Sequence, residues 1–449
     1  MTDRSPTDDI DYRAIAEEFG TPYYVYRAEE LERRFAEARR VAGDATRIYY
    51  SLKSNPNISV YAVLQGAGAL AEVSSLAELR TVQRCGTEPE DILFLGPGKS
   101  LRELVACLTA GVRIVIESLP ELDLVEAEAA RLQTTCRALL RVNPAFRGKA
   151  SGLTMGGAPR QFGIDQEQLE QYLALGERAP HVRVEGLHAY MGARILSADA
   201  VVDNTRAILE LAEAVAREQR FDLAFVDVGG GWGVPYFERE SPLDLEALRA
   251  GMRPLLEGFA DRNPAAVTAI ELGRFLSASA GTYVTQVRYT KTSVGQNFAI
   301  ADGGTNHHMA AVGIGSFVRR NFPIGLLDGE GGGSSEWTVT GPLCTPNDTL
   351  AKSAVLPQLR RGDLLGVGMS GAYGASASPG RFLSHGYPAE VLVRDGCAEL
   401  IAEPETTEHV LERQRLAAIA RRPEGRRGPA DTASRPSGPP PSHPLEVFS

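Results

Sequence analysis

Lys53 stands where an apolar, strand-like run gives way to a turn, in the sequence IYYSLKSNPN at residues 48–57. Burying an ammonium group is costly unless the group is paired or neutral. A lysine in this place therefore either extends to the surface or serves a chemical purpose. The chemistry open to a lysine amine is covalent, because it can form a Schiff base with a carbonyl compound.

Two other stretches carry groups suited to an anion and to a ring nitrogen. In VDVGGGWGVPY, Gly229, Gly230 and Gly231 follow an apolar run, and backbone N–H groups in such a loop can close on a phosphate. A tight structural turn would use the same glycines. In ELGRF, the carboxylate of Glu271 and the guanidinium of Arg274 follow another apolar run, where a surface ion pair is the simpler explanation.

These groups, with the imidazole of His188 in HAYMG, fit a single cofactor, pyridoxal phosphate (PLP). The lysine would hold it as a Schiff base, the acid would keep its pyridine nitrogen protonated, and the glycines would take its phosphate. The assignment requires a fold that brings all of them to one place.

Eight short β-rich runs alternate with segments whose apolar residues recur at helical spacing. The runs are RIYYSLK, ALAEVSS, DILFLG, VRIVIES, RALLRVNP, VEGLHAYMG, AFVDVGGG and TAIELGRF. This alternation predicts an α/β fold of the (β/α)8 TIM-barrel type, with a doubly wound open sheet as the alternative. A barrel gathers its chemistry at the carboxyl ends of its strands, and Lys53, Glu72, His188 and Glu271 all occupy such ends.

The rest of the chain predicts a second domain. After about residue 280, strand-like runs with Gly and Pro turns indicate a β-domain of the sandwich or barrel kind. We expect residues 1–27 to pack with this β-domain, residues 28–278 to form the barrel, and residues 279–420 to form the β-domain, closing with a helix at 405–420. Residues 421–449 are rich in Pro and Arg and predict a disordered tail.

Composition excludes some classes of protein. The net charge of −10 argues against a nucleic-acid partner. No run reaches the roughly 18 apolar residues that a membrane helix needs, and the acidic N-terminus does not resemble a signal peptide, so we expect a cytoplasmic protein without membrane contact. The five cysteines lack metal or disulfide spacing, and we expect no bound metal.

Seven motifs, in this order along the chain, resemble those of one family: YYSLKSNPN, ILFLGPGKS, HAYMG, DVGGGWGVPY, ELGR, GPLCTPNDTL and SGAYG. The family is the alanine-racemase-fold (type III) PLP-dependent amino-acid decarboxylases, which includes the ornithine, diaminopimelate and arginine enzymes. The resemblance implies a PLP-binding barrel with a flanking β-domain, and a homodimer whose active sites are shared between the two chains.

The resemblance also implies roles for single residues. Lys53 would bind PLP, His188 would stack on its ring, and Glu271 would pair with its pyridine nitrogen. The residues expected around the phosphate are Gly229, Gly230, Gly231, Gly273, Arg274 and Tyr373. Cys344 would come from the partner chain and lie near the carbon that is reprotonated after carbon dioxide leaves, with Asp348 of the same motif contacting the substrate.

Three positions depart from the family pattern. Thr345 stands where an acid helps to bind a distal ammonium in the diaminopimelate and ornithine enzymes. The stretch DGGTNHHMAA offers Asn306 and His307 as substrate contacts in place of the expected arginine or aspartate. Its adjacent histidines would point to opposite faces of a strand, so that they could not share a metal. Ala193 lacks the hydroxyl that contacts the phosphate in many relatives.

These departures favour a decarboxylase of a specialised biosynthetic pathway. The motifs look most like the natural-product and exopolysaccharide subgroup, some members of which act on an aminoacyl group carried by a protein. The alternatives are a decarboxylase of free diaminopimelate, ornithine or lysine, and an amino-acid racemase on the same fold. A racemase would need a second acid–base group, usually a tyrosine, opposite Lys53. A PLP-handling or regulatory homologue without activity is disfavoured, because the lysine and the phosphate-binding residues are present.

Overall fold

The computed structural model describes residues 10–146, 153–154, 159–169, 179–219, 222–312, 320–328 and 332–417. The segment predicted as a disordered tail lies outside these residues. So does the end of the predicted closing helix.

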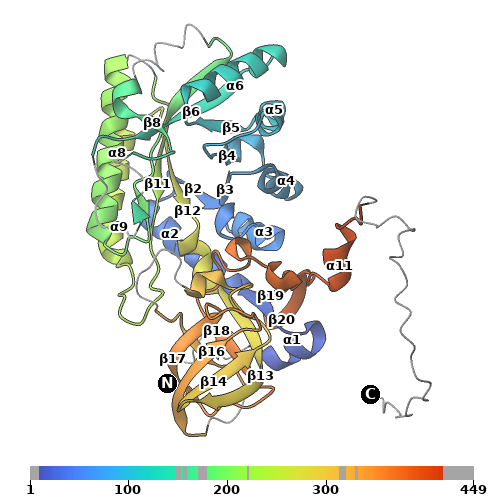
Figure 1. The fold of residues 1–449 in the computed structure, drawn as a ribbon. Coiled ribbons are helices and arrows are strands. Elements are labelled where there is room, and N and C mark those ends of the chain that lie inside the picture. The colour runs from blue at the N-terminus through green and yellow to red at the C-terminus, as the bar shows by residue number, and fades with distance from the viewer. Residues whose placement is uncertain are drawn as a thin grey trace, which may run out of the picture.

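Eight parallel strands close into a barrel, as the sequence predicts (Figure 1). In chain order they are β2 (Arg47–Ser51), β3 (Leu70–Val73), β4 (Ile92–Phe94), β5 (Arg113–Ile116), β6 (Cys136–Asn143), β9 (Val182–His188), β11 (Phe225–Gly230) and β12 (Val267–Leu272). The pairing runs from β5 through β4, β3, β2, β12, β11 and β9 to β6, which pairs again with β5. The open-sheet alternative is therefore wrong.

Alternation along each strand separates two cores. In β2, Tyr49 packs with Leu93, Val115 and Phe225 in a small cluster that fills the barrel, whereas Tyr50 belongs to the larger core. Successive side chains of a strand point to opposite faces. One face of each strand therefore fills the barrel interior and the other receives the surrounding helices.

Several of the helices around the barrel begin with side-chain caps. The helices are α2 (Ala28–Ala42), α3 (Ile58–Gly66), α4 (Leu76–Arg84), α5 (Leu101–Ala110), α6 (Leu119–Arg131), α8 (Ala198–Gln219), α9 (Leu245–Arg262) and the short α10 (Arg274–Ser277). Ser75, Ser100 and Ser118 each accept a hydrogen bond from the backbone N–H three residues on. Such caps satisfy donors that the first helical turn leaves free, and they fix where each strand-to-helix loop ends at the barrel mouth.

A mixed nine-stranded sheet forms the second domain. Its strands are β1 (Tyr23–Arg27), β13 (Gly281–Ser293), β14 (Gln296–Ala301), β15 (Ile324–Leu326), β16 (Ser334–Thr340), β17 (Thr349–Pro357), β18 (Leu364–Val367), β19 (Ala389–Arg394) and β20 (Cys397–Ala402). The N-terminal β1 lies between β13 and β19. Helix α1 (Tyr12–Phe19) packs Tyr12 and Ile15 into a hydrophobic core together with Tyr23 and Val25 of β1.

Other short elements complete the fold. They are β7 (Leu153–Thr154), β8 (Ile164–Asp165), β10 (Gly192–Ala193) and α11 (Thr407–Glu412). Helix α11 is much shorter than the helix predicted for 405–420, and the described residues after it, up to 417, are not helical. In Figure 1 it stands apart from the barrel helices, so little of its surface is covered by the rest of the chain.

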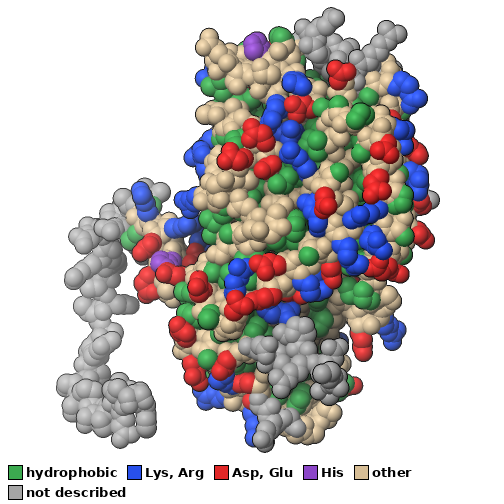
Figure 2. All heavy atoms as spheres, turned by 180° about the vertical axis from the view of Figure 1, so that it is seen from behind, with side chains coloured by type: hydrophobic (Ala, Val, Ile, Leu, Met, Phe, Trp, Pro, Cys, Tyr) green, Lys and Arg blue, Asp and Glu red, His purple; other side chains and the backbone are tan. Residues whose placement is uncertain are grey.

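The reverse face of the molecule carries charges of both signs. Figure 2 shows Lys and Arg side chains intermixed with Asp and Glu, and hydrophobic side chains scattered between them. Opposite charges at this spacing largely cancel beyond the Debye length. Among the described helices, none is long and apolar enough to cross a membrane.

Candidate active site

Lys53 lies in a 3-10 turn, Leu52–Ser54, directly after β2. Its Nζ donates to both carboxylate oxygens of Glu72, each at 2.9 Å, and Glu72 is fully buried near the end of β3. Burial opposes the charged form of Lys53, but the carboxylates of Glu72 and then Glu271 outweigh it and raise the pKa of the lysine. Lys53 is thus a paired cation whose side chain, 44% exposed, lines the cavity described below.

His188, Asp227 and Glu271 form a buried cluster at the ends of β9, β11 and β12. One ligand atom from each lies within 4.8 Å of the others, and the Nε2 of His188 is 3.5 Å from the Oε1 of Glu271. Both ring nitrogens of His188, one oxygen of Asp227 and the Oε1 of Glu271 lack a hydrogen-bond partner. Buried polar atoms without partners are rare, and here they indicate a site that receives a hydrogen-bond donor.

The two carboxyl groups of this cluster differ in charge. Burial acts to raise the pKa of Glu271, but His188 and Lys53 lower it to about 2. Burial, followed by the charge of Glu271, raises the pKa of Asp227 well above its usual value. Of the two, Glu271 therefore favours the anionic form and Asp227 the protonated form, a pattern typical of functional sites.

Two adjoining cavities open at this end of the barrel. The larger has a volume of about 450 Å³ and the smaller about 30 Å³. They share six lining residues: Lys53, Tyr190, Ala193, Glu271, Arg274 and Tyr373. A ring-shaped cofactor with a small anionic arm fits such a pair of cavities, with the reactive amine at their junction.

The three consecutive glycines are required by close packing. A Cβ on Gly230 would lie 1.7 Å from the carbonyl oxygen of Glu271, and one on Gly231 would lie 2.0 Å from that of Gly192. Gly229, with φ of 64°, rests against Ala189 and the ring of Tyr190. Of the three, Gly231 lines the smaller cavity. The loop is therefore a close-packed structural turn, and the phosphate contact of its glycines stays a prediction.

Arg274 and Tyr373 meet at the smaller cavity, although they come from different domains. The guanidinium carbon of Arg274 lies 4.3 Å from the centroid of the Tyr373 ring, and its Nη1 is 3.4 Å from the hydroxyl of Tyr236. The backbone N–H of Tyr373 donates to Ser54, one residue from Lys53, at 2.7 Å. Gly273 lines the same cavity, where a Cβ would be 3.0 Å from Ser54.

The predicted substrate contacts of the β-domain lie elsewhere. Asp348 is buried, and its two oxygens accept from the backbone N–H and hydroxyl of Thr305 and from the N–H of Leu343. Asn306 and His307 are also buried inside the β-domain. None of the three lines either cavity of its own chain, and their contact with substrate stays a prediction.

The adjacent histidines do not lie on a strand. The N–H groups of His307 and His308 both donate to Gly304, which places the two residues in a turn. Nε2 of His307 lies 2.9 Å from the carbonyl oxygen of Gly386, and Nε2 of His308 lies 2.7 Å from the hydroxyl of Ser370. Burial lowers the pKa of each to about 4. Both are therefore neutral core residues near pH 7, held by different partners.

Cys344 and Thr345 follow β16 on the surface of the β-domain. The Cys344 side chain is exposed and Thr345 is partly exposed, and neither lines the cavities of its own chain. Their predicted roles would require another chain to bring them to the barrel mouth.

Sequence reasoning missed several residues of the site. Tyr190 lines both cavities, so the structure offers a second aromatic side chain besides His188 for the face of a cofactor ring. Asp227 lies beside Glu271 in the buried cluster. Glu72 was noted only as a residue at a strand end, and its pairing with Lys53 was not predicted. All three lie in or just after barrel strands, and that position was the available signal. It does not distinguish a cavity residue from a core residue.

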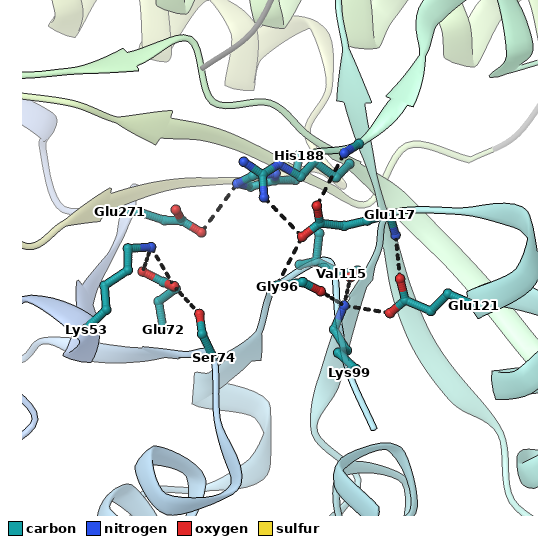
Figure 3. Close-up of polar contacts among 12 residues, drawn as sticks. Lys53, Glu72, Ser74, Gly96, Lys99, Val115, Glu117, Glu121, His188 and Glu271 are labelled. Atoms are coloured by element: carbon teal, nitrogen blue, oxygen red, sulfur yellow. Dashed lines mark hydrogen bonds and ion pairs between the residues drawn. The ribbon is translucent and has the colours of Figure 1, made fainter. Parts of the chain in front are cut away.

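A second buried network forms the opposite wall of the larger cavity (Figure 3). The ammonium of Lys99 donates to the carbonyl oxygens of Gly96 and Val115 and to Glu121, at 2.6–2.7 Å. Glu117 accepts from the N–H of Gly96 and from Arg141, each at 3.0 Å. These hydrogen bonds tie the loop of Gly96 to β5 and α6 and hold it in place at the cavity.

Known proteins resemble this chain over most of its length. Residues 28–278 match the family described as "Pyridoxal-dependent decarboxylase, pyridoxal binding domain". The chain is 35% identical, over 413 residues, to the L-glutamyl-[BtrI acyl-carrier protein] decarboxylase of Niallia circulans, covering 91% of this chain and 96% of that protein. It is 34% identical, over 396 residues, to the diaminopimelate decarboxylase of Deinococcus radiodurans, covering 88% and 96%.

The fold is shared with solved decarboxylases. The crystal structure of diaminopimelate decarboxylase from Helicobacter pylori complexed with L-lysine matches with a TM-score of 0.81 at 26% identity, over 90% of this chain and 98% of that one. The match to the family and the matches to these relatives agree with the lysine, the buried acid and the paired cavities described above. The chain therefore belongs to the pyridoxal-dependent decarboxylases, enzymes that bind PLP in the barrel and remove the α-carboxylate of an amino acid or amino-acid derivative as carbon dioxide.

Proposed function

We propose that this decarboxylase acts, in a specialised biosynthetic pathway, on an amino acid whose distal end is an uncharged acyl group attached to a carrier protein. The observation that carries this proposal is the state of Asp348, whose two oxygens are occupied inside the β-domain. With Thr345 beside Cys344, no predicted contact from this loop offers a free carboxylate for a distal ammonium. The similarity to a glutamyl carrier-protein decarboxylase supports the same conclusion.

The residues present fit PLP. Glu271, an anion with an unpartnered buried oxygen, suits a protonated pyridine nitrogen, while Arg274 and Gly231 line the smaller cavity, where they suit an anion. Two carboxyl groups and an imidazole could also hold a divalent cation, but Lys53 and Arg274 at the adjoining cavities favour PLP. When bound, PLP supplies a conjugated cationic ring that accepts the electron pair of the broken carbon–carbon bond.

The residues of this chain supply the reactive amine, the contacts to the cofactor ring and the proton transfers. Lys53, with Glu72 beside it, presents the amine that substrate replaces. Glu271 keeps the ring nitrogen protonated, and Tyr190 and His188 are the aromatic side chains available to pack against the ring. Closing the site removes water from around the substrate carboxylate, which destabilises that charge relative to neutral carbon dioxide. Lys53 can return a proton to the α-carbon.

We place Cys344 in the partner's active site. Its side chain is exposed and lies outside both cavities of its own chain, so a homodimer with the β-domain of one chain at the barrel mouth of the other would bring it into use. The thiol is then a second proton donor to the α-carbon. A dimer of this kind would also bring Thr345 to the distal end of the substrate.

Carbon dioxide release and product mass across a substrate panel test the proposal. The panel holds lysine, ornithine, arginine, diaminopimelate, glutamate and a carrier-tethered glutamyl group, each with added PLP. We expect turnover of the tethered substrate and little of the free basic amino acids. A Thr345→Glu variant should gain activity on diamino acids and lose it on the tethered substrate, since it adds a charge next to the distal end.

Rapid turnover of free lysine, ornithine or diaminopimelate by the unaltered enzyme would refute the carrier proposal and leave a decarboxylase of primary metabolism. The racemase alternative has its own signature in the same assay. Unreacted substrate would lose optical activity without release of carbon dioxide, whereas a decarboxylase leaves it unchanged.

A further inference from the structure

The smaller cavity is lined by two arginines. Arg274 belongs to the predicted phosphate site, but Arg194 was assigned no role, and it lines the same cavity of about 30 Å³ together with Gly231 and Gly273. Two cationic residues at one small cavity repel each other unless an anion lies between them. The phosphate of PLP is an anion of suitable size and charge.

The backbone of Arg194 is fixed against the glycine loop. The N–H of Ile195 donates to Gly231 at 2.9 Å, and the N–H of Gly233 donates to Ile195 at 2.8 Å. Arg194 itself has a φ of 61°, in the left-handed region that residues other than glycine rarely adopt. Such strained residues concentrate at functional sites, and this one follows directly on β10 at the edge of the cavity.

Neighbouring side chains hold the guanidinium of Arg194. It lies 5.4 Å from the ring centroids of both Tyr236 and Phe237, and its Nη2 is 3.3 Å from the Oε1 of Glu240. Arg274 approaches the same Tyr236, with its guanidinium carbon 5.9 Å from the ring. The guanidinium groups of Arg194 and Arg274 therefore both approach the ring of Tyr236. Glu240 can neutralise the charge of Arg194.

Ala193, the residue before Arg194, explains why an additional cation is needed at the phosphate. Ala193 lines both cavities but has no hydroxyl to donate to a phosphate. A hydrogen bond to a charged group contributes appreciably to binding, and the guanidinium of the next residue can donate several. We propose that Arg194 binds the phosphate of PLP alongside Arg274 and replaces the contact that Ala193 cannot make.

Affinity for two forms of the cofactor tests this role without measuring turnover. PLP-depleted Arg194→Gln enzyme is titrated with PLP and with pyridoxal, which has the same ring and aldehyde but no phosphate. Binding is followed by the fluorescence of Trp232, which also lines the smaller cavity. We expect the Kd for PLP to rise about tenfold or more and the Kd for pyridoxal to stay within about twofold.

Two further variants sharpen the test. Arg320 also approaches Glu240, at 3.9 Å, and Phe237, at 5.4 Å, but lines neither cavity. Arg320→Gln is therefore the matched control and should leave both affinities unchanged. Adding Ala193→Ser to the Arg194→Gln enzyme should restore part of the affinity for PLP. The affinity for pyridoxal should not change.

Two results would overturn the proposal. Equal weakening of PLP and pyridoxal by Arg194→Gln would show that the arginine supports the loop and not the phosphate. Unchanged affinity for both would show that its guanidinium serves only Glu240 and the two aromatic rings.

Discussion

At the scale of single residues, burial and pairing decide which carboxyl group carries charge. Glu271, with its pKa lowered to about 2, and Asp227, with its pKa raised, lie in one cluster. Their values are pushed apart because the second of two adjacent buried carboxyl groups loses its proton only at a high cost. When PLP is bound, its ring nitrogen would therefore pair with a single anion, the carboxylate of Glu271.

Glu72 should control the pH at which Lys53 reacts. Glu72→Gln removes the main group that raises the pKa of Lys53, so the free amine should form at lower pH. We expect the midpoint of the pH profile for bond formation between Lys53 and the PLP aldehyde to fall by about one unit. The measurement is the rate of the accompanying absorbance change in PLP-depleted enzyme.

The exposed Glu88 provides a control, and Glu88→Gln should leave the profile in place. An unshifted midpoint in Glu72→Gln enzyme would mean that Lys53 does not depend on this pair for its charge.

At the scale of elements, the site depends on how closely β11 approaches β12. Gly230 pairs with Glu271 across these strands, which leaves no space for a side chain and sets the position of the acid. The nearby turn of Gly273 and the loop of Tyr373 both pack on Ser54. The positions of Glu271, Lys53 and Tyr373 are thus fixed through backbone contacts.

Gly230→Ala should destabilise the barrel. The added Cβ would lie 1.7 Å from the carbonyl oxygen of Glu271, and since neither backbone can yield cheaply, we expect a loss of about 1–3 kcal/mol or more. Urea unfolding of the holoenzyme measures it. Gly258 in α9 meets only the flexible Arg262 side chain, at 3.5 Å, so Gly258→Ala should be neutral or stabilise by up to about 1 kcal/mol. Equal midpoints for both variants would contradict this account.

At the scale of the whole molecule, the barrel and the β-domain are joined by packing contacts as well as by the connecting chain. Strand β1 lies inside the sheet of the β-domain, while the next element, α2, covers the barrel and makes contact with β19. Tyr373 reaches from the β-domain into the barrel mouth of its own chain. The same domain leaves Cys344 exposed and away from that mouth.

Mixing two impaired variants tests whether Cys344 acts across a dimer. Lys53→Ala enzyme should be nearly inactive in carbon dioxide release, and Cys344→Ala enzyme should be clearly slower than the unaltered enzyme. In a mixed dimer one site combines the intact Lys53 of one chain with the intact Cys344 of the other, so activity should return after subunit exchange. Absence of recovery, with mixed dimers demonstrated by a tag on one variant, would place Cys344 in its own chain or outside the reaction.

The sequence by itself determined the barrel, the second β-rich region and the principal charged residues of the site. Strand-length apolar runs separated by helical periodicity have few other solutions, and Lys53, His188, Glu271 and Arg274 stand at or just after strand ends. β1 was not predicted as a strand, because a short run gains its pairing only from strands far away in the chain.

Tertiary structure decided which polar residues face the cavities. Asp348 and His307 have the composition of binding residues, yet their hydrogen bonds are made inside the β-domain. Tyr190 and Asp227 lie inside the motifs HAYMG and DVGGGWGVPY, and Arg194 follows the first of them closely. The motifs do not single these residues out, and only the fold brings them to or beside the cavities. Residue type records what a side chain can do. Its partners are set by contacts between strands and loops that the sequence keeps far apart, and these exist only in the folded chain.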